Sequence, residues 1–207
     1  MLSFASLASS STDRASSRAL VIALSDSNIA RMSHKREPAI IISSIYHLSE
    51  VIEQADAVIS ILGSSDKLIF PDVGSRPVLR LKFDDVGYAS GKLVAPSRER
   101  IANLIDFARG WNRVGTLLLH CRAGSSRSPA AAMIAAATLG WPYGADLALR
   151  VRTSKAYFRP NETMLKLADG LFGISPGLVD LSRSVPFPTR TDDWKPVRIP
   201  LIMPERP

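Results

Sequence analysis

Cysteine is almost absent from this chain: Cys121 is the only one among 207 residues. A single cysteine cannot form an internal disulfide, and such usage is typical of the reducing cytoplasm, so we expect a cytoplasmic protein. Histidine is nearly as scarce, with three scattered residues. The sequence therefore predicts no metal-binding cluster, and no cofactor is expected.

Long apolar runs are also missing. None approaches the roughly 18 residues that a membrane helix needs, so no membrane span is expected. Residues 19–24 are apolar but too short for a secretory signal core, and no small-residue cleavage site follows them. The serine-rich first 37 residues contain few acids; we favour a flexible extension over a transit peptide.

Aromatic residues make up only 7% of the chain, and no nucleic-acid-binding module is recognisable, so a nucleic-acid partner is not expected. The formal net charge is nevertheless +7. Much of this charge falls between Cys121 and Pro160, where a single acid, Asp146, accompanies six basic residues: Arg122, Arg127, Arg150, Arg152, Lys155 and Arg159. A basic region of this kind favours phosphorylated or otherwise acidic ligands.

The one cysteine lies in a distinctive stretch, residues 120–128, which reads His-Cys-Arg-Ala-Gly-Ser-Ser-Arg-Ser. An apolar run precedes it and Pro129 follows, which predicts a buried strand, a tight loop and a helix N-terminus. The unpaired amides of a helix N-terminus bind anions, and a thiol placed there loses its proton easily. Arg127 can grip two phosphate oxygens, and Gly124 permits backbone conformations closed to other residues.

These residues resemble the signature of the cysteine-dependent protein tyrosine phosphatase superfamily: His-Cys, five residues, Arg, then Ser or Thr. The five residues between the cysteine and the arginine, Arg-Ala-Gly-Ser-Ser, and the Ser-Pro that follows the arginine are most similar to the dual-specificity branch. The resemblance covers roughly residues 39–172 and includes Arg159-Pro160-Asn161. Ser125 departs from it, because the family usually has an apolar residue there. Rhodanese-type sulfur carriers are less similar, since their loop is usually shorter and need not close on arginine.

The hydrophobic patterns predict an α/β fold. We expect strands at 39–43, 57–62, 78–83 and 116–120, and helices at 48–55, 96–111, 129–140, 143–151 and 162–171. Their alternation predicts a three-layer sandwich in which helices flank a mostly parallel central sheet. We place the flexible N-terminal extension at 1–37, the catalytic domain at 38–175 and a proline-rich extended tail at 176–207, which could lie along the domain through Phe187, Trp194 and Ile199.

The resemblance implies a role for each site residue. Cys121 is the expected nucleophile, and Ser128 either donates a hydrogen bond to its sulfur or caps the helix. The phosphate is expected to lie against the loop formed by Arg122, Ala123, Gly124, Ser125, Ser126 and Arg127. His120 is expected to order the loop and to assist ionisation of the thiol, and Asn161 to hold nearby backbone.

A general acid is expected on a loop across the cleft, since the family places an aspartate some thirty to forty residues before the cysteine. Asp85 precedes Cys121 by 36 residues and Asp84 by 37. The family pattern of an apolar residue, any residue and then Asp selects Asp85. Asp84 remains the alternative, either as the acid or as a solvated neighbour.

Three functions fit these residues. The first is a metal-independent phosphomonoester hydrolase, a protein tyrosine or dual-specificity phosphatase that forms a phosphocysteine and acts on a phosphorylated protein. The second is a phosphatase of a phosphoinositide, nucleotide or RNA 5′ end; the uncharged Ala123, Ser125 and Ser126 count against a lipid substrate. The third is a non-catalytic phosphate-binding module.

Overall fold

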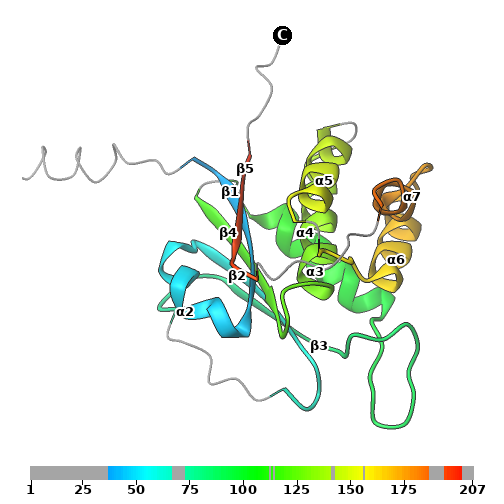
Figure 1. Ribbon diagram of the computed structural model, residues 1–207, viewed down its shortest axis with the longest axis horizontal. Helices are drawn as coiled ribbons and strands as arrows, with labels where there is room; N and C mark the ends of the chain where they lie inside the picture. Colours follow the sequence, from blue (N-terminus) through cyan, green and yellow to red (C-terminus); the bar gives the residue numbers. More distant parts are fainter. Residues whose placement is uncertain are drawn as a thin grey trace, which may run out of the picture. The chain divides into compact units, whose positions relative to one another are not determined.

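A five-stranded sheet in the order β3-β2-β4-β1-β5 forms the centre of the computed structural model (Figure 1). The strands are β1 (Ala39–Ser44), β2 (Ala57–Leu62), β3 (Val78–Lys82), β4 (Thr116–Cys121) and β5 (Val197–Pro200). Strands β3, β2, β4 and β1 pair in parallel, and β5 pairs antiparallel with β1. The predicted α/β class with a mostly parallel sheet is confirmed.

The structure describes residues 37–66, 73–111, 113, 115–140, 143–155, 157–186 and 194–201. The predicted N-terminal extension lies outside this range except for Glu37, as does Phe187. None of the helices in the described part of the chain is long and apolar enough to cross a membrane.

Six α-helices accompany the sheet: α2 (Leu48–Val51), α3 (Arg98–Gly110), α4 (Arg127–Ala137), α5 (Tyr143–Thr153), α6 (Glu162–Phe172) and α7 (Leu178–Arg183). Short 3₁₀ turns at Ile45–His47 and Ile52–Gln54 flank α2. The apolar side chains form two clusters. One joins helices α3 to α7 to one face of the sheet, and the smaller joins α2 to the other face. These are the three layers that the sequence predicts.

The central strand β4 is buried along its whole length, as expected of a strand covered on both faces. Leu117, Leu119 and Cys121 belong to the large cluster, whereas Leu118 belongs to the small one. Helix α4 follows β4 and is also buried at all eleven positions, which explains its nearly continuous run of small and apolar residues. Strands β4 and β1 and helix α4 are therefore enclosed along their whole lengths.

The segment 176–207 differs from the extended tail expected for it. It contains helix α7, and it supplies the edge strand β5. Buried Arg152 on α5 fixes α7 by donating from Nε to the Ser182 carbonyl at 3.2 Å. Within β5, Ile199 is 4% exposed. Just before β5, the ring centroid of Trp194 lies 4.6 Å from that of Tyr157. Proline content concealed this order, because β5 is an edge strand that tolerates proline at its end.

This arrangement predicts that β5 contributes to stability. Ile199→Ala removes a buried side chain and should lower the free energy of unfolding by about 2–4 kcal/mol, the usual cost of such a truncation. The exposed Lys195→Ala is the matched control and should change it by less than about 0.5 kcal/mol. Urea unfolding followed by circular dichroism measures both, and equal effects would show that β5 does not pack on the domain.

Candidate active site

The loop of residues 122–126 connects the end of β4 to the start of α4. Gly124 has a φ of +76°, and a Cβ at this position would lie 3.0 Å from the backbone nitrogen of Ser44. The Ile45 amide also donates to the Arg122 carbonyl at 3.3 Å. The loop is therefore pressed against the end of β1, and only glycine fits at its centre.

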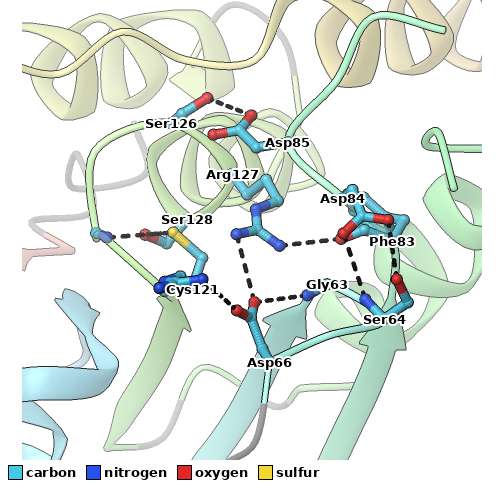
Figure 2. A network of polar contacts seen from close by, with 12 residues as sticks. Gly63, Ser64, Asp66, Phe83, Asp84, Asp85, Cys121, Ser126, Arg127 and Ser128 are labelled. Carbon is cyan, nitrogen blue, oxygen red and sulfur yellow. Dashed lines mark hydrogen bonds and ion pairs between the residues drawn. The ribbon is translucent and has the colours of Figure 1, made fainter. Parts of the chain in front are cut away.

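The thiol of Cys121 lies at the bottom of this loop and is 1% exposed. The Gly124 amide donates to Sγ at 3.2 Å, and Ser128 Oγ lies 3.2 Å from Sγ (Figure 2). Ser128 Oγ also lies within donating distance of the Ser43 carbonyl, at 3.4 Å. The Ser128 hydroxyl has a single proton to donate. When Cys121 is a thiolate, the hydroxyl can donate to Sγ; when Cys121 is a thiol, the thiol can donate to Ser128 Oγ and the hydroxyl can donate to the Ser43 carbonyl.

Ser128 is not the cap of α4, so that alternative is wrong. The N-cap position belongs to Ser126, and Ser128 lies inside the first turn of the helix. Its hydroxyl points toward the sulfur from the helix, on a residue that is fully buried. The hydroxyl thus lies 3.2 Å from the sulfur, and its expected role toward the thiolate stays a prediction.

The His120 ring lies on the other side of the sheet, because successive side chains of a strand point to opposite faces. Its neighbour Leu118, two residues earlier, packs in the small cluster with α2, whereas Cys121 packs in the large one. Burial lowers the pKa of His120 from 6.5 to about 4, so the ring is neutral near pH 7. A neutral ring supplies no positive charge to the thiol, so the expected help with ionisation stays a prediction and cannot come from such a charge.

Arg127 opens α4 and is 5% exposed. One terminal nitrogen donates to the Phe83 carbonyl at 2.9 Å, and the other lies 3.8 Å from the Asp66 carboxylate. The third nitrogen of the guanidinium, Nε, is buried and has no hydrogen-bond partner among the described residues. An arginine donor of this kind beside an anion loop is a natural place for a phosphate oxygen.

The two adjacent aspartates occupy different environments. Asp84 is 8% exposed and accepts from the Val94 amide at 2.8 Å and from the amide and hydroxyl of Ser64. Asp85 is exposed and lies over the loop, where its Oδ1 accepts from Ser126 Oγ at 2.8 Å and from Asn161 Nδ2 at 2.8 Å. Figure 2 shows Asp84 beside Ser64 and Asp85 beside Ser126. Of the two carboxylates, Asp85 is the one that contacts the anion loop.

Asn161 joins the acid to the loop and to α6. Its side-chain oxygen caps α6 by accepting from the Met164 amide at 3.0 Å, and its side-chain nitrogen holds Asp85. Its backbone amide donates to the Ser126 carbonyl at 3.3 Å, and the Arg159 amide donates to the Ser125 carbonyl at 2.9 Å. The segment 159–161 thus forms a wall of the site, which agrees with the backbone-holding role expected of Asn161.

Asp66 is a residue of the site that the sequence analysis did not identify. Its carboxylate lies between the Gly63 amide, at 2.8 Å, and the guanidinium groups of Arg122 and Arg127, at 3.2 and 3.8 Å. The available signal was its place four residues after the end of β2, since the carboxyl ends of parallel strands meet at one edge of a sheet. The sequence could not say that β2 lies next to β4, so the signal was not specific.

The structure therefore brings together Cys121, the loop 122–126, Arg127, Ser128, Asp85 and Asn161. Asp84 instead contacts Ser64 and Val94, and His120 lies on the face of the sheet that Leu118 shares. No group of three or more His, Cys, Asp or Glu residues in the described ranges is arranged to hold a metal ion.

No protein-family model matches the chain, and no curated protein matches it. Solved structures similar to it include DUSP15, with 18% identity over 71% of this chain and 90% of that one and a TM-score of 0.48. PTPMT1 has 12% identity over 65% of this chain and 92% of its own chain, with a TM-score of 0.45. Tk-PTP in its active form has 15% identity over 70% of this chain and 89% of its own chain, with a TM-score of 0.44. At this identity and with TM-scores below 0.5, the functional argument rests on this chain's own contacts.

The buried ring of His120 makes a prediction about pH. Its folded pKa, about 4, lies below the ordinary 6.5, so the unfolded chain takes up the proton first as the pH falls. The stability that His120 contributes is complete above about pH 6.5 and should be lost progressively toward pH 4, by about 3 kcal/mol in all. His120→Gln should flatten this part of the stability curve, measured by urea unfolding from pH 4 to 7.5; an unchanged slope would contradict the prediction.

Proposed function

We propose that this protein is a metal-independent phosphomonoester hydrolase that works through a phosphocysteine, a protein tyrosine or dual-specificity phosphatase. The observation that carries the proposal is one constellation: Cys121 Sγ lies within hydrogen-bond distance of the Gly124 amide and Ser128 Oγ, beside the buried guanidinium of Arg127. Nucleophile, anion-binding donors and fixed positive charge converge on one loop.

In the first step, Cys121 Sγ attacks the phosphorus atom and the bond from phosphorus to the substrate oxygen breaks. That oxygen leaves with a proton from Asp85. Both hydrogen bonds to Asp85 end on Oδ1, and no described residue bonds to Oδ2. This leaves Oδ2 as the atom that delivers the proton, while Ser126 and Asn161 fix the plane of the carboxyl group.

In the second step, water attacks the phosphorus atom of the phosphocysteine, and the Asp85 carboxylate takes a proton from that water. The bond from phosphorus to sulfur breaks and the electron pair returns to Sγ. Ser128 Oγ, 3.2 Å away, donates to the departing thiolate. Inorganic phosphate leaves, and the proton taken by Asp85 restores the acid for the next cycle.

The phosphoryl group gathers negative charge on its equatorial oxygens during both steps. The loop amides and Arg127 supply the donors for these oxygens, and they are fixed before substrate binds. Arg127 is held by the Phe83 carbonyl and by Asp66, so the position of its guanidinium group is fixed by the protein. This preorganisation supports catalysis rather than simple anion binding.

The position of Asp85 argues against a non-catalytic phosphate-binding module. An ionised carboxylate over a phosphate site repels the ligand, so a module selected for binding alone gains nothing from it. Here two side chains, Ser126 and Asn161, hold Asp85 in that place. The uncharged Ala123, Ser125 and Ser126 in the loop support a protein substrate over a phosphoinositide.

Replacement of the nucleophile tests the proposal. Cys121→Ser should abolish hydrolysis of para-nitrophenyl phosphate, because a serine hydroxyl at this position is not ionised, and the variant should still bind inorganic phosphate. The measurements are initial rates and isothermal titration calorimetry. Wild-type rates should be the same with and without EDTA; full activity in the variant, or loss of wild-type activity with the chelator, would refute the mechanism.

Replacement of the acid separates Asp85 from Asp84. Asp85→Asn should reduce turnover of a phosphotyrosine peptide by about 10²- to 10⁴-fold, the usual size of general acid catalysis. The loss should shrink for a strongly activated aryl phosphate, whose leaving group needs no proton. The alkaline limb of the pH–rate profile should flatten in this variant.

Asp84→Asn is the matched control and should keep the bell-shaped profile, since Asp84 bonds only to Ser64 and Val94 among the described residues. If Asp84→Asn flattens the alkaline limb and Asp85→Asn does not, the assignment is off by one residue. If neither variant changes it, the acid is a different group.

A further inference from the structure

One buried carboxylate is shared by the two arginines of the anion loop. The Asp66 side chain is 6% exposed; its Oδ1 lies 3.2 Å from an Arg122 nitrogen and its Oδ2 3.8 Å from an Arg127 nitrogen. The Gly63 amide fixes Oδ2 at 2.8 Å, directly after β2 (Figure 2). The carboxylate therefore has a defined position and is not a mobile surface acid.

The two arginines stand in different surroundings. Arg127 is buried and belongs to the phosphate cradle, whereas the Arg122 side chain is 58% exposed at the rim of the loop. A hydrogen bond with Tyr46 and then the charge of Asp66 raise the pKa of Arg122 above its ordinary value. Arg122 is therefore held at the rim by Tyr46 and Asp66, two residues that lie outside the anion loop.

An arginine at the rim of a phosphate site normally attracts a second anionic group of the ligand. Here Asp66 already occupies one edge of that guanidinium and offsets its charge. A second phosphate on the substrate would have to displace Asp66 before it could bind that guanidinium. The pairing thus disfavours ligands that carry two neighbouring phosphates.

We propose that Asp66 is a specificity-determining residue that withholds Arg122 from the substrate, so that the site prefers phosphomonoesters with a single phosphate to ligands with two adjacent phosphates. This inference rests on the proposed function, because it names the substrate class of the same site. Asp66 also contacts Arg127, and the Arg122→Ala variant described below separates an effect through Arg127 from the effect through Arg122.

The test compares inorganic phosphate with pyrophosphate, in the Cys121→Ser background so that neither is consumed. Isothermal titration calorimetry gives both dissociation constants with and without Asp66→Asn. Asn keeps the size of the side chain and an acceptor for Gly63 while removing the charge. We expect the ratio of the two constants to shift about three- to fivefold in favour of pyrophosphate, the usual size for one partly exposed charge pair.

Arg122→Ala supplies the matched control. In the Asp66→Asn background it should abolish the shift, because the gain comes from the freed guanidinium. An unchanged ratio in Asp66→Asn, or a shift that persists without Arg122, would overturn the proposal; weaker binding of both ligands with the same ratio would make Asp66 a positioning residue for Arg127 only. Loss of all binding, or of folding in a melting experiment, in both Asp66→Asn and Asp66→Ser would also overturn it.

These outcomes are independent of catalysis. If the wild-type protein hydrolyses no phosphomonoester but the ratio shifts as expected, the proposed function fails and the inference about ligand selectivity holds. If hydrolysis occurs and the ratio does not move, the inference alone fails.

Discussion

The parallel register of β4 between β1 and β2 is the constraint on which the site depends. It sets Cys121 opposite Ser44 on one side and opposite Ile61 on the other. All three strands therefore end at the same edge of the sheet, and their following residues are forced together there. Ser43 and Ser44 meet the anion loop, and the turn after β2 places Asp66 against Arg122 and Arg127. Side chains separated by up to 85 positions in the sequence become neighbours through this pairing alone.

Local patterns were sufficient to predict the parts of the site that lie within one strand, loop and helix. The apolar run before His120, the glycine at 124 and the small residues after Pro129 each report a local requirement, and all of them appear in the structure. The choice of Asp85 over Asp84 came from the resemblance, through the family pattern of an apolar residue, any residue and then Asp. The contacts of the two carboxylates support that choice, since one faces Ser64 and the other faces the loop.

The features that sequence did not predict depend on pairings between distant elements. Asp66 lies in a turn of unremarkable composition, and its importance comes from the adjacency of β2 and β4. The order of α7 and β5 was hidden because proline content suggested an extended tail, whereas the burial of Ile199 and the carbonyl contacts of Arg152 decide the outcome. The charge state of His120 follows from burial on the α2 side of the sheet, which the motif His-Cys does not reveal.

The first turn of α4 connects the chemistry in a simple way. Three consecutive residues carry different tasks: Ser126 contacts the proposed acid, Arg127 supplies the positive charge, and Ser128 contacts the sulfur. Because they share a single helical turn, their relative positions are fixed by backbone geometry rather than by flexible loops. The rest of α4 holds this first turn in place, because the helix is buried along its whole length. A displacement of the acid relative to the nucleophile therefore requires either movement of Asp85 away from Ser126 and Asn161 or disruption of the core helix, and the first is much the less costly. The hydrogen bonds from Ser126 and Asn161 are thus the contacts that hold Asp85 over the anion loop.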